Sequence, residues 1–235
     1  MPALEAKSIT KTFHEGRVVV PVLRGISLSL ERGEIVALMG PSGSGKTTLL
    51  SILGCILTPS SGRVVIDGTE VDYERPGRLP EVRKRSVGFI FQQYNLFPAL
   101  TARDNVAYAL NLKGIVGREA YRKADELLEI VGMTDRSRFH PRDLSGGQKQ
   151  RIAVARALAG RPRVLLADEP TANLDSEMGS LILDLFERLA REQDCAILIV
   201  THDPSVRACC SRVLHIRDGS LATVDHEELA FAHGA

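Results

Sequence analysis

Gly40-Pro41-Ser42-Gly43-Ser44-Gly45-Lys46-Thr47 is a glycine-rich stretch flanked by two segments of different periodicity. The segment before it, Ile35–Met39, is an unbroken apolar run, which is typical of a strand buried on both faces. After it, the apolar residues follow the spacing of one helix face: Leu49, Ile52, Leu53 and Ile56. The order of strand, glycine loop and helix predicts an α/β core built around a phosphate-binding turn.

The glycine-rich stretch matches the G-x-x-x-x-G-K-[ST] pattern of P-loop NTPases. Its glycines let successive backbone N–H groups surround phosphate oxygens, and the start of the following helix adds favourable partial charge. We expect Lys46 to reach the β- and γ-phosphates of a bound nucleotide and the Thr47 hydroxyl to bind Mg²⁺, with Thr48 in the same site. The alternative is a glycine-rich turn without a ligand, and the flanking strand and helix argue against it.

A second motif places two acidic residues at the end of an apolar run. Val164–Ala167 reads as a buried strand, and Asp168 and Glu169 follow it directly. Asp168 is suited to hold Mg²⁺ through water, and Glu169 to polarise an attacking water molecule. In isolation, two solvated carboxylates would be the simpler interpretation. In a chain that also carries the phosphate loop, the pair predicts nucleotide hydrolysis.

The other apolar runs indicate how the α/β core is built. Ala196–Val200 and Val213–Ile216 also read as buried strands, and Ser176–Gln193 has one apolar helix face. Strands that alternate with helices predict a mostly parallel sheet. Shorter strands are expected in the first third of the chain: Val18–Val20, Ile26–Leu30, with Gly25 as the break between them, and Val64–Ile66. The last dozen residues are expected to fray.

Helical signals replace strand signals between about residues 93 and 160. Thr101 with Asp104 reads as a capping pair, and Ser145 with Gln148 has the spacing of a capping box. An apolar helix stripe lies between these two pairs: Ala120, Ala124, Leu127, Leu128 and Val131. The sequence therefore predicts a helical insertion within the α/β core.

Further residues, in a fixed order, make the chain resemble an ATP-binding cassette (ABC) ATPase, the motor subunit of a membrane transporter. The resemblance covers nearly the whole chain and is carried most strongly by Leu144-Ser145-Gly146-Gly147-Gln148, called the signature loop below. It implies a role for each matching residue. Phe13 would stack on adenine, Gln92 would link Mg²⁺ and water to the helical insertion, Asp175 would join two subunits, and His202 would contact the γ-phosphate.

The same resemblance implies an assembly. Residues 1–235 would form one ABC nucleotide-binding domain, with an α/β core from residues 1–92 and 161–235 and a helical subdomain from residues 93–160. The core would combine a mostly parallel sheet with an N-terminal antiparallel β subdomain. Two copies would pack head-to-tail as a homodimer, with ATP held between each phosphate loop and the opposite signature loop. Ser145 can cap the helix that follows it, which leaves free N–H groups for an anion. Separate transmembrane permease subunits would complete the transporter.

Composition restricts the partners and the location. A net charge of +1 gives no support for nucleic-acid binding, which normally needs a basic excess. No uncharged apolar run reaches the ~20 residues that cross a bilayer, and residues 1–7 lack the apolar core that a secretory signal requires. We expect a protein at the cytoplasmic face of the membrane, peripheral to it.

The chain has four cysteines: Cys55, Cys195, Cys209 and Cys210. They are expected to be small buried thiols, and the alternative is a redox or soft-metal role for the adjacent pair Cys209 and Cys210.

The branch of the family is indicated by short segments. Residues 52–55, 60–62 and 167–176 look most like the ATPases of the macrolide-exporter and lipoprotein-releasing group, which implies export or extraction of a drug, lipid or lipoprotein. Residues 91–98 also resemble ATPases of polar amino-acid importers. Two other classes remain open: a regulatory cassette that drives a membrane partner without transport, and a soluble cassette that acts on DNA or ribosomes. The sequence does not identify the cargo.

Overall fold

The computed structural model describes residues 1–16, 18–172 and 174–222, and it contains two β-sheets. The smaller sheet is antiparallel and has the strand order β2-β1-β4-β5. Its strands are β1 (Leu4–Glu15), β2 (Val18–Leu30), β4 (Ser61–Ile66) and β5 (Thr69–Glu70). The predicted N-terminal antiparallel subdomain is therefore present. The expectation that the last dozen residues fray falls outside the described residues.

The larger sheet has six strands in the order β10-β9-β3-β8-β7-β6. Its strands are β3 (Ile35–Met39), β6 (Val87–Ile90), β7 (Val164–Asp168), β8 (Ala196–Thr201), β9 (Arg212–Arg217) and β10 (Ser220–Ala222). The pairs from β9 to β6 are parallel, and β10 adds an antiparallel edge. Every residue of β3, β7 and β8 is buried, as their unbroken apolar runs predict.

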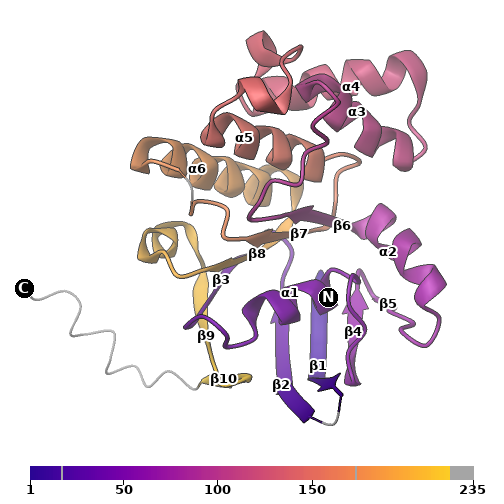
Figure 1. Cartoon of the computed structure of the whole chain (residues 1–235), viewed down its shortest axis with the longest axis vertical. Coiled ribbons are helices and arrows are strands. Elements are labelled where there is room, and N and C mark those ends of the chain that lie inside the picture. The colour runs from indigo at the N-terminus through magenta and orange to yellow at the C-terminus, as the bar shows by residue number, and fades with distance from the viewer. Residues whose placement is uncertain (17, 173, 223–235) are drawn as a thin grey trace, which may run out of the picture.

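Helices cover both faces of the six-stranded sheet (Figure 1). In Figure 1, α5 and α6 lie above this sheet, α3 and α4 form the layer above them, and α1 lies below it, next to the small sheet. The helices are α1 (Lys46–Leu53), α2 (Leu79–Ser86), α3 (Ala102–Leu112), α4 (Gly117–Ile130), α5 (Gly146–Ala157) and α6 (Ser176–Gln193). Short 3₁₀ turns are η1 (Pro76–Arg78), η2 (Thr134–Arg136), η3 (Pro141–Asp143) and η4 (Pro204–Cys209).

The apolar core forms two clusters, one on each face of the six-stranded sheet. Strand β3 contributes to both clusters. Ala37 and Met39 belong to the cluster that includes α3, α4, α5 and α6, whereas Val36 and Leu38 belong to the cluster that includes α1 and the small sheet. Successive side chains of a strand point to opposite faces, so a central strand supplies both clusters. Both faces of the strand that precedes the phosphate loop are thus packed, which fixes where the loop begins.

The helical region between β6 and β7 has the caps that the sequence predicts. Thr101 caps α3, where its Oγ1 accepts a hydrogen bond from the backbone N–H of Asp104 at 3.1 Å. Ser145 and Gln148 form the complete capping box of α5. The sequence interpretation missed Asn105, which is fully buried and bonds the backbone of the segment before α3. Its amide group holds that segment against the first turn of the helix.

Gly25 does not separate two strands, contrary to the prediction. Strand β2 runs without interruption from Val18 to Leu30, and Gly25 lies inside it with φ 90°. The register between β1 and β2 shifts near this point, between Ile9 and Thr10. A glycine with positive φ inside a paired strand marks a β-bulge, which bends the strand without ending it.

Strands β1, β5 and β6 and helix α2 were also not predicted. Within the described residues, no helix combines the length and the apolar character that crossing a membrane requires.

Candidate functional site

The candidate site lies at one edge of the six-stranded sheet, where the parallel strands end at their carboxyl termini. In the strand register, Met39 at the end of β3 is opposite Thr201 at the end of β8, and Asp168 at the end of β7 is opposite Val200. Carboxyl ends of neighbouring parallel strands are where α/β proteins bind ligands. The loops after β3, β7 and β8 therefore start side by side.

The phosphate loop is a tight turn from β3 into α1. Gly43 and Gly45 have φ of 79° and 102°, a left-handed conformation that glycine adopts without cost. Gly40 is needed for a different reason, since a Cβ there would lie 2.2 Å from the carbonyl oxygen of Ile216 in β9. The remaining loop residues lie between these glycines or open α1, which begins at Lys46: Pro41, Ser42, Ser44, Thr47 and Thr48.

Lys46 folds back over the phosphate loop. Its ammonium group donates to the carbonyl oxygens of Gly40 at 2.7 Å and Pro41 at 2.9 Å. The side chain is half-buried, so the charge stands at the mouth of the loop, near the N-terminus of α1. A positive side chain and a helix N-terminus together favour an anionic ligand such as a phosphate group.

Thr47 and Asp168 meet across the sheet edge, although 121 residues separate them in the sequence. The Thr47 hydroxyl donates to Oδ1 of Asp168 at 3.4 Å, a long hydrogen bond. Burial raises the pKa of the Asp168 carboxyl, and the neighbouring Glu169 adds to this, while Thr47 and Lys46 oppose it. A hydroxyl and a buried carboxylate are hard oxygen donors of the kind that Mg²⁺ prefers, so this donor set fits a magnesium ion.

Glu169 lies just beyond β7, with φ 47°, a left-handed conformation that is uncommon for this residue type. Its backbone N–H bonds the carbonyl oxygen of Val200 at 2.8 Å. Its carboxylate accepts a hydrogen bond from Thr201 Oγ1 at 3.0 Å and lies 2.8 Å from Nδ1 of His202. The structure thus joins the second acidic residue to the predicted histidine. Thr201 was not predicted, since its only signal was its place between an apolar run and a histidine.

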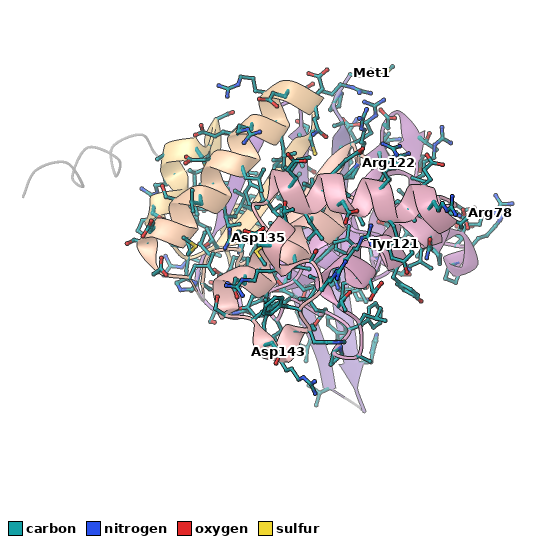
Figure 2. The ribbon with its side chains drawn as sticks, turned by 90° about the horizontal axis from the view of Figure 1, so that it is seen from above. Met1, Arg78, Tyr121, Arg122, Asp135 and Asp143 are labelled. Atoms are coloured by element: carbon teal, nitrogen blue, oxygen red, sulfur yellow. The ribbon has the colours of Figure 1, made fainter. Side chains whose placement is uncertain are left out.

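The signature loop leads into α5 at an exposed edge of the molecule. Asp143, two residues before Ser145, lies at the periphery in Figure 2, which also shows Tyr121 and Arg122 on α4. Ser145 Oγ accepts from the Gln148 N–H at 3.2 Å, and Gln148 Oε1 accepts from the Ser145 N–H at 3.0 Å. Gly146 and Gly147 occupy the first turn between these two residues. The first turn keeps backbone N–H groups for a further acceptor.

The remaining predicted residues are Gln92, Phe13 and Asp175, and within the described residues no hydrogen bond joins their side chains to the groups above. Gln92 is exposed and follows β6 by two positions, at the same sheet edge. Phe13 is 37% exposed on β1, and the Lys11 ammonium lies 5.0 Å from its ring centroid. Asp175 caps α6 by accepting a hydrogen bond from the Met178 N–H at 2.8 Å.

The cysteines divide into two kinds. Cys55 and Cys195 are buried, as the sequence predicts. Cys209 and Cys210 are half-buried instead, at the end of η4, with their Sγ atoms 4.0 Å apart. The part of the chain that the structure describes holds no cluster of three or more His, Cys, Asp or Glu side chains arranged for a metal ion.

Comparisons with known proteins identify the family of the chain. The model of the ABC transporter family matches residues 23–172. An uncharacterized ABC transporter ATP-binding protein of Thermotoga maritima is 44% identical over 228 residues, which cover 97% of this chain and 97% of that protein. The macrolide export ATP-binding/permease protein MacB of Syntrophobacter fumaroxidans is 46% identical over 221 residues, which cover 93% of this chain and only 31% of that protein.

Solved structures of the ATP-binding cassette MJ0796 are also similar. A dimeric structure of MJ0796 aligns with a TM-score of 0.88 at 38% identity and covers 94% of this chain and 97% of that chain. A second one, a dimeric post-hydrolysis state bound to ADP and Pi, aligns with a TM-score of 0.86 at 38% identity and the same coverage, 94% and 97%. Fold and sequence therefore point to the same family.

Proposed function

This chain belongs to the ABC transporter family, as an ATP-binding cassette with the fold of an ATPase, and on that premise we propose that it powers a membrane exporter. The proposed reaction is hydrolysis of ATP to ADP and phosphate at the carboxyl edge of the six-stranded sheet. The observation that carries the assignment is the meeting of Thr47 with Asp168, because it joins the phosphate loop to the acidic pair.

In the proposed mechanism, the phosphate loop binds the ATP phosphates through its N–H groups and Lys46. The Lys46 ammonium would exchange the carbonyl oxygens of Gly40 and Pro41 for phosphate oxygens. Thr47 and Asp168, with Gln92, would hold Mg²⁺, which supplies charge neutralisation at the phosphates. Phe13 would stack on the adenine ring and fix the base end of the nucleotide.

Glu169 is proposed as the base that takes the proton of the attacking water. The contacts of its carboxylate with Thr201 and His202 support this role, because they fix the orientation of both carboxylate oxygens. His202 is 74% exposed in its side chain, so its ring can contact the γ-phosphate from the open side of the site. In this proposal Glu169 is the base, Thr201 orients it and His202 contacts the phosphate, all within one hydrogen-bonded cluster.

We propose a homodimer in which Ser145, Gly146, Gly147 and Gln148 bind the ATP of the partner chain. The dimeric structures of MJ0796 support an assembly of two cassettes. In this dimer residues 93–160 act as a helical subdomain that carries the signature loop, and residues 1–92 and 161–235 form the core. Asp175, which caps α6 beside the signature loop, would communicate between the two subunits.

Separate transmembrane permease subunits are proposed as partners, with the chain peripheral at the cytoplasmic face of the membrane. The similarity to MacB, whose name describes macrolide export, supports an export or extraction function. This chain covers 31% of that protein, so the substrate class (drug, lipid or lipoprotein) is part of the proposal. A reconstituted complex in vesicles tests it: cargo displacement coupled to ATP turnover is expected, and ATP turnover without displacement would favour a regulatory cassette.

Glu169→Gln tests the catalytic assignment directly. The amide keeps the size of the side chain but cannot accept a proton, so turnover should fall by about 10²–10⁴-fold. ATP binding should persist, and an ATP-bound dimer should accumulate on size-exclusion chromatography. Thr201→Val, which removes one contact of the carboxylate, serves as the comparison and should lower turnover less. Turnover of Glu169→Gln near the wild-type value would refute the base assignment.

A further inference from the structure

Arg156 of α5 holds the loop that follows β6. Its guanidinium donates to the carbonyl oxygen of Tyr94 with an Nη2–O distance of 2.7 Å, and a second hydrogen bond joins it to the carbonyl oxygen of Asn95. Tyr94 and Asn95 have φ of 60° and 48°. A left-handed conformation costs residues other than glycine about 1 kcal/mol or more each, so contacts from outside the loop must maintain it.

The charge of Arg156 is directed at this loop alone. Burial lowers the pKa of its guanidinium, and no carboxylate lies within ion-pair distance of it among the described residues. Backbone carbonyl dipoles therefore balance the charge. Hydrogen bonds from a charged donor are roughly twice as strong as neutral ones. The loop that carries Gln92 is thus tied to α5 by a strong, partly buried contact.

The C-terminal end of α5 is also fixed on the sheet. A Cβ at Gly88 in β6 would lie 2.5 Å from the carbonyl oxygen of Ala157, so the helix end and the strand are in direct contact. The other end of the same helix begins directly after Ser145. Helix α5 has 12 residues, or about 18 Å at 1.5 Å per residue. One continuous helix therefore connects the signature loop with the loop after β6.

We propose that Arg156 is a positioning residue that couples the Gln92 loop to the signature loop through α5. The inference rests on the proposed function, in which Gln92 serves the chain's own nucleotide and Ser145 serves the nucleotide of the partner. With Arg156 in place, a displacement of the Gln92 loop displaces α5 as well. Each ATP site is then linked to the other through the chain that contributes to both.

Arg151 offers a matched control on the same helix. Its guanidinium also donates to backbone carbonyl oxygens, those of Val131 at 3.4 Å and Gly132 at 3.2 Å, at the end of α4. Arg151→Met removes the same charge and the same type of contact, but it leaves the loop after β6 unchanged. If Arg156 had a purely structural role, the two substitutions should lower kcat to the same extent.

The experiment compares Arg156→Met, Arg156→Lys and Arg151→Met with the wild-type chain. For Arg156→Met we expect kcat for ATP to fall about tenfold, since two charge-assisted hydrogen bonds are lost, while the dissociation constant for ATP stays within about twofold. Hydrogen exchange should accelerate at the N–H groups of Tyr94 and Asn95, which bond Phe91 and Gln93 at 3.0 and 2.6 Å. Arg156→Lys should restore part of kcat because an ammonium can reach one carbonyl. Arg151→Met should keep kcat within about twofold.

Two outcomes would overturn the coupling. One is wild-type kcat in Arg156→Met together with faster exchange in the loop, and the other is an equal loss of kcat in Arg156→Met and Arg151→Met. If Arg156→Met does not fold, Arg156→Lys decides, because wild-type kcat with loosened loop exchange in that variant contradicts the proposal. Absence of ATP turnover in the wild-type chain with its membrane partner would instead contradict the proposed function, and that measurement involves no variant.

Discussion

Replacing Gly147 with alanine is expected to separate the stability of the chain from its association with a second copy. A Cβ at this position would lie 3.4 Å from Cγ of Met178 and 3.5 Å from Cδ2 of Leu174, which is ordinary van der Waals contact. Gly147 is helical and has no positive φ, so alanine fits its backbone. Within one chain, therefore, the substitution meets no obstacle.

The expected magnitudes differ between the two properties. Alanine is favoured over glycine in a helix by up to about 1 kcal/mol, and a protein of this size changes its Tm by about 2–4 °C per kcal/mol. The Tm should accordingly stay constant or rise by up to about 4 °C. In the proposed dimer the same methyl group would lie in the signature loop that binds the partner's phosphate, where it would hinder the approach of the loop N–H groups. Loss of backbone donors to a developing negative charge lowers turnover by about 10²–10³-fold.

Thermal unfolding, ATP turnover and ATP-dependent dimer formation in the Glu169→Gln background measure both effects. Gly77→Ala is the control, because nothing lies within 4 Å of a Cβ there and both properties should stay unchanged. A stable Gly147→Ala chain that dimerises and hydrolyses ATP like the wild type would refute the proposed contact with the partner's nucleotide. A clear fall of the Tm would refute the packing argument instead.

A mixed dimer of Ser145→Arg and Lys46→Ala chains places both changes in one composite site, so the other site should remain active. Nucleotide labelling that finds two equally impaired sites would contradict the proposal that each signature loop binds the partner's ATP. Thiol reactivity should follow the pKa directions, since the thiolate is the nucleophile. The hydrogen bond with Cys210 lowers the pKa of Cys209, whereas burial raises that of Cys55 to about 11 and of Cys195 to about 12. Near pH 8, a disulfide reagent should modify Cys209 first, and peptide mapping that finds Cys55 or Cys195 modified before it would contradict this order.

Local patterns predicted the centre of the fold well. The apolar runs at β3, β7 and β8 identified the buried strands because strands covered on both faces need apolar residues at every position. The capping residues of α3 and α5 were also predicted, since a capping pair acts within four residues. These signals are local in sequence, so the sequence alone contains them.

Features that depend on distant partners were missed. Strand β6 has four residues and includes Gly88, so its assignment rests on its pairing with β7 and on the close approach of α5. The contacts of Arg156 join residues that are 61 and 62 positions apart. Gly25 was assigned to a turn because a bulge and a turn both favour positive φ, and only the neighbouring strand distinguishes them. Sequence patterns around these residues do not record which segment will be their neighbour.

The strand order has a consequence for protein synthesis. Strand β3, which leads into the phosphate loop, pairs with β8 and β9, and β8 begins only at Ala196. A growing chain therefore exposes its phosphate loop on the ribosome long before the strands that flank β3 have been made. Such long-range pairing is slow and leaves apolar strands exposed in the meantime. The strand that leads into the phosphate loop can therefore be paired on both sides only after residues 196–217 have been synthesised.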